Sequence, residues 1–324
     1  MSRWTERLAT LGTRRVLGPA AACAGLLACA AAIAPLTVPP SLDRATPLEL
    51  SGITWSRAIA RYVVVSDDAV AGGEKHAPLL FSIGLDGHMD ATPITIDGVG
   101  ELNDLESITE ATDGTLFVAT SHSLNKHGHL PSSRRRLLHL KLTPDRHAHE
   151  LGEIDLTTAR TAGGELPWGS GLLDVEALAF RDGALYIGLK SPLASDGATT
   201  ILRIAAAESV VDSGTLHPGA AEIWAHPRFA VSHAGATVHE GISDLSFRPD
   251  GRLLVVANSP KGMPSDGGGA LWQLDVKGAT PRLIERFEGL KPEGVTVSPD
   301  RGALVIVFDR DGEKPVWTKR PLPP

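Results

Sequence analysis

The sequence predicts an all-β fold, a β-propeller of five four-stranded blades, and three observations support this prediction. The 324-residue chain contains 34 Gly and 23 Pro but only 5% aromatic residues, a composition that favours many short strands joined by tight turns. A similar pattern of apolar runs and turns occurs five times along the chain. The repeats begin at intervals of 53 to 70 residues, which fits one four-stranded blade per repeat.

Each repeat opens with an apolar strand that ends in a turn. The opening stretches are SGITWS (51–56), ESITEA (106–111), EALAFR (176–181), EGISDL (240–245) and EGVTVS (293–298). A turn follows, usually with Asp and Gly, and then a second apolar run, a variable loop and two further runs. Alternation such as Leu185, Ile187 and Leu189 predicts strands with two apolar faces that pack on neighbouring blades. A β-sandwich of hairpins is the alternative, and the fixed order within each unit disfavours it.

The two ends of the chain are expected to close the ring. The last unit lacks a fourth strand, and the segment 45–50 before the first unit has no other partner, so we expect it to supply the outer strand. Closure by both termini leaves no free sheet edge, which protects an all-β protein from edge pairing. Six blades are the alternative if the long insert 157–173 contains strands.

Residues 1–34 form a secretory signal pattern that precedes a propeller domain at 35–324. Four arginines are followed by an apolar, Ala-rich run, VLGPAAACAGLLACAAAIA. An uncleaved membrane anchor is the alternative, and weak twin-arginine (13–17) and lipoprotein (26–29) signatures leave the export route open. All these routes place the domain in the periplasm or outside the cell. Membrane contact is expected only through this segment, and the protein is expected to be a monomer.

Charge and cysteine content exclude several classes of function. Both cysteines, Cys23 and Cys29, lie in the N-terminal segment, so the domain has no disulfide, thiol nucleophile or Cys-based zinc site. The segment 1–34 has a net charge of +3 and the whole chain has a net charge of −7, so the domain has a net charge of about −10. Such an acidic domain is poorly suited to nucleic acid and better suited to cations or small polar ligands.

Four glutamates open the repeats and are expected to meet at one mouth of the propeller channel. They are Glu106, Glu176, Glu240 and Glu293, and Ser51 takes their place in the first repeat. The loops after the second strands return to the same face and bring Asp68, Lys190 and Asn258. Two carboxylates about 4 Å apart repel by up to ~4 kcal/mol at an effective dielectric near 20, so a compensating group is needed. Oxygen ligands favour Ca²⁺, and less well Mg²⁺ or Mn²⁺. The alternative is structural, with each glutamate accepting hydrogen bonds from the next blade's backbone.

The loop of the second repeat, SHSLNKHGHLPSSRRRLLHL, is rich in basic residues. The spacing of His122, His127 and His129 matches no standard zinc motif, so we interpret the histidines as part of a solvated loop. Arg135 and Lys190 are candidates to bind an anionic group beside the acidic ring, because arginine forms paired hydrogen bonds with phosphate or carboxylate. The alternative is a surface charge run. Nucleophile elbows, phosphate loops, dinucleotide-binding glycine patterns and His-Glu-x-x-His are absent from the sequence.

Several motifs resemble a bacterial family of exported proteins known only as a domain of unknown function. They are DLESIT (104–109), ATSHSLNKHG (119–128), SSRRRLLHLKL (132–142), DVEALAF (174–180), LYIGLKSPL (185–193) and GISDLSF (241–247) with LLVVANS (253–259). The family is distantly similar to esterase-like phytase propellers and, in architecture, to gluconolactonase and regucalcin propellers. The resemblance implies a propeller with an acidic, metal-binding mouth. Gluconolactonase-like relatives hold their metal with a strand-opening Glu, an Asn and an Asp. Here Glu106, Glu176, Glu240, Glu293 and Asn258 match in residue type.

Two functions follow as expectations. The first is a metal-dependent hydrolase of phosphoesters or lactones that acts on a small anionic substrate. In it the glutamates, Glu176 and Glu240 above all, would be metal ligands, and Asn258 a further ligand. His122 or Asp68 would be the general base, and Arg135 and Lys190 would hold the anionic group. The second is a non-catalytic propeller that binds a ligand, a peptide or an envelope polymer at the same mouth.

Overall fold

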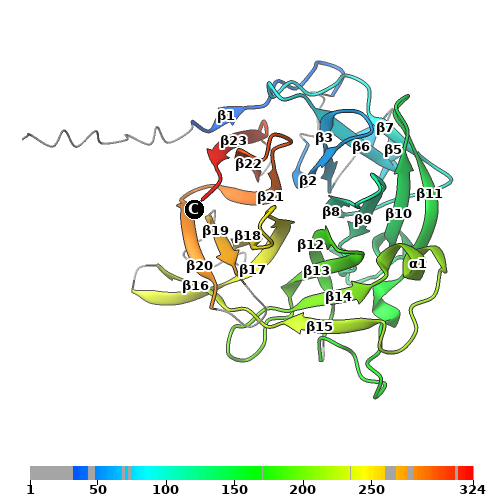
Figure 1. The fold of residues 1–324 in the computed structure, drawn as a ribbon, viewed down its shortest axis with the longest axis vertical. Coiled ribbons are helices and arrows are strands. Elements are labelled where there is room, and N and C mark those ends of the chain that lie inside the picture. The colour runs from blue at the N-terminus through cyan, green and yellow to red at the C-terminus, as the bar shows by residue number, and fades with distance from the viewer. Residues whose placement is uncertain are drawn as a thin grey trace, which may run out of the picture. The chain divides into compact units, whose positions relative to one another are not determined.

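The computed structural model describes residues 32–42, 48–67, 70–71, 74–169, 171–233, 235–259, 268–275, 280–310 and 313–323. Residues 31–324 belong to one compact unit, and most of the predicted signal segment lies outside the described residues. The described strands form a β-propeller of four-stranded units, as the repeats predict (Figure 1). Among the described residues, none of the helices has the length and apolar character needed to cross a bilayer.

The strands of each unit follow one another in the chain. The first unit contains β2 (Leu50–Ser56), β3 (Arg61–Ser66), β6 (Leu79–Ile83) and β7 (Ile94–Asp97). The second contains β8 (Leu105–Glu110), β9 (Leu116–Thr120), β10 (Leu137–Leu142) and β11 (His147–Ile154). The third contains β12 (Asp174–Arg181), β13 (Ala184–Ser191), β14 (Ile201–Ala205) and β15 (Ala221–Ala225). The fourth contains β17 (Ala236–Phe247), β18 (Leu253–Asn258), β19 (Gly269–Leu274) and β20 (Arg282–Phe287). The fifth contains β21 (Lys291–Val297), β22 (Ala303–Asp309) and β23 (Val316–Pro321), with β1 (Ala34–Pro35) at its outer edge.

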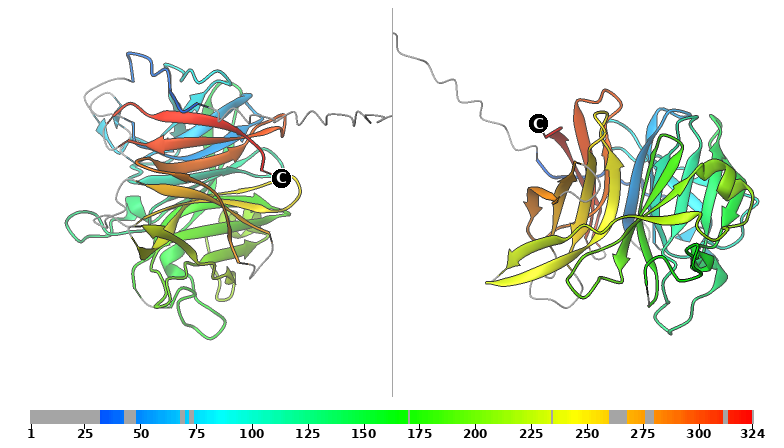
Figure 2. Two further views of the ribbon diagram at one scale, coloured as in Figure 1. Left: turned by 90° about the vertical axis from the view of Figure 1, so that its left-hand side faces the viewer. Right: turned by 60° about the horizontal axis from the view of Figure 1, so that its bottom comes forward.

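Further short elements lie outside these four-stranded units. The short strands β4 (Val70–Ala71) and β5 (Glu74–Lys75) pair with each other, and β16 (Phe229–His233) pairs with the first half of β17. The hairpin of β16 and β17, yellow in Figure 2, projects from the rest of the unit. The helical elements are η1 (Ser132–Arg134), η2 (Leu156–Thr158) and α1 (Ala207–Asp212).

The turn between β12 and β13 shows why the repeats fold into hairpins. Arg181 pairs with Ala184, so only Asp182 and Gly183 form the loop, and both have positive φ (51° and 72°). Two-residue loops of this kind match the right-handed twist of the flanking strands and favour Asp-Gly. The Asp-Gly signals therefore fix the register of the inner strand pair.

Both faces of the strands are buried, as the alternation predicts. Leu185, Ile187 and Leu189 are fully buried and pack with residues of the second unit, including Phe117. On the opposite face, Gly188 lies against Ile242 of the fourth unit. Burial of each large aliphatic side chain contributes about 1.5–3 kcal/mol, so the contacts between blades replace the missing disulfides.

The ring closes through the two ends of the described chain, but not with the segment that we expected. Ala34 pairs with Trp317, and the N–H group of Leu36 donates to the carbonyl of Pro315 at 3.0 Å. The assignment of this strand to 45–50 is wrong, because Leu50 begins β2; residues 43–47 lie outside the described chain. The described part of the insert 157–173 contains the end of η2 and no strand, which gives no support to a sixth blade there.

The strand directions decide which residues meet at the channel. In each unit the innermost strand and the next strand are antiparallel, so the start of the first and the end of the second lie at one face. Glycine lets two of these innermost strands approach closely. A Cβ added to Gly52 would lie 2.9 Å from the backbone of Ser107 and Ile108, and one on Gly294 would lie 2.9 Å from the carbonyl oxygen of Ser51.

Candidate functional site

An acidic cavity of about 380 Å³ lies where the innermost strands begin. Its lining combines eight carboxylates and two lysines, together with Leu50, Ser51, Ser123, Asn258 and Ser259. The carboxylates are Glu49, Asp67, Asp104, Glu106, Asp174, Glu176, Glu293 and Asp309, and the lysines are Lys190 and Lys291. We call this the acidic cavity. All five units contribute to it, as the repeat predicts.

β-Bulges turn three of the predicted glutamates toward the cavity. In the pairing of β8 with β9, Leu105 opposes Thr120 and Ser107 opposes Ala119, so Glu106 is the extra residue. Glu176 in β12 and Glu293 in β21 occupy the same position in their own strands. A bulge redirects one side chain without ending the strand, and bulges are common beside functional sites.

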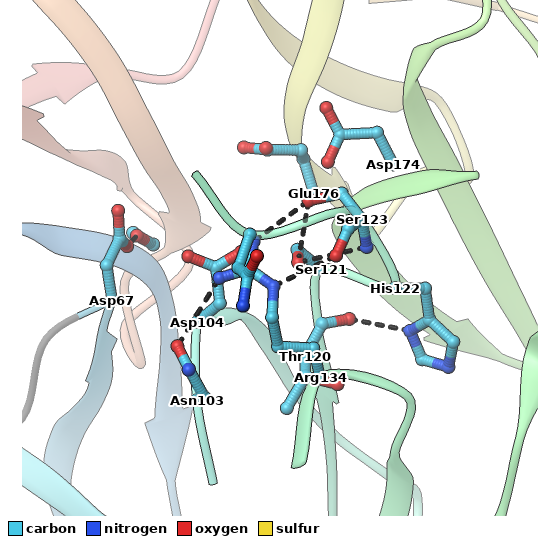
Figure 3. Close-up of polar contacts among 12 residues, drawn as sticks. Asp67, Asn103, Asp104, Thr120, Ser121, His122, Ser123, Arg134, Asp174 and Glu176 are labelled. Carbon is cyan, nitrogen blue, oxygen red and sulfur yellow. Dashed lines mark hydrogen bonds and ion pairs between the residues drawn. The ribbon is translucent and has the colours of Figure 1, made fainter. Parts of the chain in front are cut away.

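Three carboxylates lie close enough together to hold one cation. Single oxygens of Asp67, Asp104 and Glu106 lie within 4.8 Å of one another. Asp67 follows β3 and accepts a hydrogen bond from the Ser51 hydroxyl, and Asp104 accepts one from the Arg134 guanidinium (Figure 3). Asp104 has a left-handed backbone (φ 67°) just before β8, a conformation that Asp adopts more readily than most residues other than glycine.

The cavity disfavours ionised carboxylates. Burial raises the pKa of Asp67 to about 8, the Ser51 hydrogen bond opposes this shift, and the charges of Asp104, Glu293 and Glu49 add to it. Burial also raises the pKa values of Glu106 and Glu176 well above the usual range. Neighbouring carboxylates raise both values further. A bound cation would relieve this repulsion.

Lys190 forms an ion pair with one of these glutamates. Its ammonium group lies 3.0 Å from Glu176, while Lys291 lies 3.5 Å from Asp309. Burial alone would lower the pKa of Lys190, but the surrounding carboxylates, Glu176 first among them, raise it well above its usual value. Lys190 therefore stays protonated and offsets part of the negative charge of the cavity.

His122 lies outside the acidic cavity, so its predicted place at the mouth is wrong. Its side chain is fully buried, and its ring is directed away from Asp104 and Glu176 (Figure 3). Nδ1 donates to the carbonyl of Thr120 at 2.7 Å, and Nε2 accepts from the N–H of Leu156 at 3.3 Å. Burial lowers the pKa of His122 to about 4. The ring is a neutral structural link that has no nitrogen left for proton transfer.

The other predicted residues divide between the cavity and the rest of the fold. Asn258 lines the cavity, whereas Asp68 lies outside the described residues. Arg135 forms an ion pair with Asp155 at 3.0 Å and lines a different cavity, of about 760 Å³, beside the second unit. Its expected place at the mouth is therefore wrong. Arg134, the preceding residue, reaches the acidic cavity's edge through Asp104 instead.

Glu240 is also displaced from the mouth. It is fully buried, and its Oε2 accepts a hydrogen bond from the Trp272 indole at 3.0 Å. Burial raises the pKa of Glu240 to about 7. The bulge position in β17 belongs to Ser243, three residues later, which accepts a hydrogen bond from Asn258 Nδ2 at 2.7 Å. The fourth unit thus contributes Asn258 and Ser259 to the lining rather than a glutamate.

Replacement of Glu240 by glutamine should favour stability more at pH 8 than at pH 5, by up to about 3 kcal/mol. A raised folded-state pKa means that the protonated carboxyl stabilises the fold fully below pH 4.5, and this contribution is lost as the pH rises through 7. Glutamine keeps the acceptor for Trp272 and has no charge to bury. Melting temperatures at pH 5 and pH 8 test this, and a larger gain at pH 5 than at pH 8 would contradict it.

Two charged residues of the lining, Glu49 and Lys291, were not predicted from the repeats. Glu49 directly precedes β2, and Lys291 stands two residues before Glu293 at the start of β21. Both could have been found by extending each repeat by two residues toward its N-terminus, where Asp104 and Asp174 also lie.

Comparisons with known structures support the fold. A putative exo-β-1,3-galactanase from Bifidobacterium bifidum is 13% identical, with 89% of this chain and 92% of that chain covered and a TM-score of 0.51. An exo-β-1,3-galactanase from Phanerochaete chrysosporium is 8% identical, with 90% and 64% covered and a TM-score of 0.52. A gluconolactonase from Xanthomonas campestris is 15% identical, with 86% and 87% covered, and its TM-score of 0.39 is too low to bear on the fold. Identities this low show similarity of fold alone.

A match to a family model identifies the family of this chain. Among curated proteins, no sequence matches the chain. Residues 48–311, far more than half of the chain, match the model described as "Phytase-like: Esterase-like activity of phytase". This range begins just before β2 and contains all the residues that line the acidic cavity. The chain therefore belongs to the phytase-like family described by esterase-like activity of phytase.

Proposed function

We propose that this protein is a cation-dependent hydrolase of small anionic phosphoesters or of lactones, and that the acidic cavity is its active site. The observation that carries the proposal is the convergence of eight carboxylates and two lysines from five units on one cavity. Membership of the phytase-like family supports ester hydrolysis as the reaction class. The signal pattern at residues 1–34 supports a location in the periplasm or outside the cell.

The residues of the cavity fit a hard divalent cation. Asp67, Asp104 and Glu106 would hold it, because their oxygens already lie within 4.8 Å of one another. Carboxylate oxygens without thiolate or imidazole favour Ca²⁺, with Mg²⁺ or Mn²⁺ as alternatives. Asn258 offers a further oxygen, since its buried Oδ1 has no hydrogen-bond partner among the described residues. When bound, such a cation supplies Lewis-acid polarisation of an ester oxygen.

Electrostatics explain why a cation would be required. Eight carboxylates outnumber two lysines in the lining, so the ionised cavity repels a phosphoester. The pKa values of Asp67 and Glu106, raised chiefly by burial, show the cost of gathering these charges in a desolvated place. A divalent cation lowers this cost and makes the cavity able to accept an anion.

The remaining residues would bind and orient the substrate. Lys190, protonated beside Glu176, would donate a hydrogen bond to an anionic oxygen of the substrate. Glu176 would transfer the proton, because burial raises its pKa and a carboxyl with a raised pKa can act as an acid or a base. Ser123 and Ser259 also line the cavity and add hydroxyl groups for the polar parts of the substrate.

Replacement of Glu106 by glutamine should abolish both cation-dependent stabilisation and hydrolysis. For the wild-type protein, Ca²⁺ at 100 times its dissociation constant adds about 2.7 kcal/mol, which raises the melting temperature by several degrees over the EDTA-treated protein. Glutamine removes one anionic ligand of three, so most of this shift should disappear. Melting curves with EDTA and with millimolar Ca²⁺, and turnover of a chromogenic phosphomonoester and a lactone, measure the two effects.

Glu110→Gln is the matched control, because it makes the same change at the other end of β8, where Glu110 pairs with Arg57 at 2.7 Å. The control should keep the Ca²⁺ shift and the turnover. A Ca²⁺ shift without turnover of either substrate would overturn the hydrolase and leave a binding propeller. The absence of any shift with Ca²⁺, Mg²⁺ or Mn²⁺ would overturn the cation site itself.

A further inference from the structure

A second group of metal-ligating side chains lies on the outer strands of the first two units, away from the acidic cavity. β7 and β11 lie side by side at the outside of the propeller (Figure 1). They pair in parallel, with His149 opposite Asp97 and His147 opposite Thr95. His147 and His149 are two residues apart on one strand, so their side chains point to the same face. The register therefore places two imidazoles and one carboxylate on one patch of the surface.

The contacts confirm this arrangement. Oδ2 of Asp97 lies 3.0 Å from Nδ1 of His147 and 3.4 Å from Nδ1 of His149. The two rings are stacked with an interplanar angle of 15° and centroids 6.4 Å apart. The side chains of His147, His149 and Asp97 are 50%, 52% and 39% exposed, so a dissolved ion can reach them and the rings have room to rotate.

We propose that His147, His149 and Asp97 form a binding site for Zn²⁺ or a similar transition-metal ion. Two imidazole nitrogens and one carboxylate oxygen are the ligands that Zn²⁺ prefers, whereas Ca²⁺ requires a shell of oxygens. Binding would replace the hydrogen bond between His147 and Asp97 and the ion-pair contact between His149 and Asp97, and a small rotation of each half-exposed ring would bring the nitrogens to one ion. Water would complete the coordination on the exposed side.

The position of the site gives it a structural effect. β7 is the outermost strand of the first unit and β11 that of the second, and their pairing joins the two units into one eight-stranded sheet. Only three residue pairs of the parallel ladder connect these strands, from His147 with Thr95 to His149 with Asp97. An ion bound by both strands would cross-link the two units at this junction. The proposal does not depend on the function of the acidic cavity.

Titration of the full-length, zinc-free protein with Zn²⁺ tests the site. Millimolar Ca²⁺ is kept present, so that the acidic cavity is occupied and does not compete. Calorimetry should give one Zn²⁺ per chain, and melting curves should rise by a few degrees on saturation. His149→Ala and His147→Ala should each weaken binding by about 100-fold or more, because even changes to residues around a metal's ligands weaken binding about 10- to 100-fold. Cu²⁺ as a probe should show two coordinated nitrogens by electron paramagnetic resonance.

His88→Ala is the matched control. Nδ1 of His88 lies 3.2 Å from Asp86, so the variant removes an exposed His–Asp pair from the first unit while the proposed ligands stay intact. It should bind Zn²⁺ like the wild type. The proposal is overturned if the wild type does not bind Zn²⁺, or if His149→Ala binds it equally well. It is also overturned if binding is lost only in a variant of the exposed loop histidines, His127 and His129.

Discussion

Replacement of Lys190 by methionine is expected to destabilise the cation-free protein by about 2–3 kcal/mol. The ammonium group of Lys190 lies 3.0 Å from Glu176, whose side chain is only 7% exposed. Loss of the lysine therefore leaves a buried carboxylate unpaired. Breaking a fully buried pair costs about 3–5 kcal/mol, and the effect is smaller here because the lysine side chain is 35% exposed and partly screened. Urea unfolding in EDTA measures the change.

Calcium should reverse much of this loss. Methionine removes a positive charge that competes with the cation for the same carboxylates, so the variant should bind Ca²⁺ more tightly than the wild type does. The Ca²⁺ midpoint of the melting-temperature shift is therefore expected to move to lower concentration. Lys141→Met, at an exposed position on β10, is the control and should change neither property. A Lys190→Met protein that is as stable as the wild type in EDTA would contradict the assignment of Lys190 as the cavity's internal cation.

Much of the fold could be predicted because its signals are local. The Asp182-Gly183 turn sets the register of one strand pair, and alternation of apolar residues along β13 sets its two buried faces. The closing strand could not be predicted in the same way. Ala34 and Pro35 form only two residues of ladder at the end of an apolar, signal-like run. Their pairing with β23 is a long-range contact that leaves no periodic pattern in the sequence.

The glutamates of the acidic cavity were found as the residues that open their repeats, and each of the three bulges lies six or seven residues before the Asp of a turn. Glu106 and Glu293 stand seven residues before Asp113 and Asp300. In the fourth unit the residue seven before Asp250 is Ser243, while Glu240 stands ten before it. Alignment of the repeats on the letters Glu-Gly-Ile placed the fourth unit's bulge at Glu240, three residues before the observed bulge at Ser243. The distance to the following turn predicts the bulge position better.

His122 shows what the sequence alone could not provide. Its position after the second strand predicted a place at the mouth, but its backbone has φ 56°, and the ring enters the fold beneath Leu156 instead of the cavity. A left-handed residue is uncommon outside glycine, and nothing in its neighbours along the chain forecasts it. The direction of a single loop side chain depends on such local geometry, whereas the direction of a carboxylate on a strand follows from how that strand pairs with its neighbour.

Replacement of Asp244 by alanine is expected to cost about 2–5 kcal/mol of stability and to leave the cation site intact. Asp244 is 1% exposed and stands beside the bulge of β17. Its carboxylate accepts the N–H of Leu245 and the N–H of Val295 in β21, each at 2.8 Å, so it ties the fourth unit to the fifth. Alanine would leave two buried N–H groups unsatisfied, at about 1–3 kcal/mol each.

Urea unfolding of Asp244→Ala measures this loss of stability. Asp250→Ala is the control, because Asp250 lies in an exposed turn of the same unit. The control should lose less than about 1 kcal/mol, since exposed positions contribute little. A loss that small for Asp244→Ala would show that the two backbone groups find other partners. A large loss of stability in Asp244→Ala, with an unchanged Ca²⁺-dependent shift in melting temperature, would show that acidic residues of the repeats have two separate roles. Asp244 would bind the backbone of the next blade, as the structural alternative for the glutamates supposed, while Glu106 and its equivalents would face the cavity.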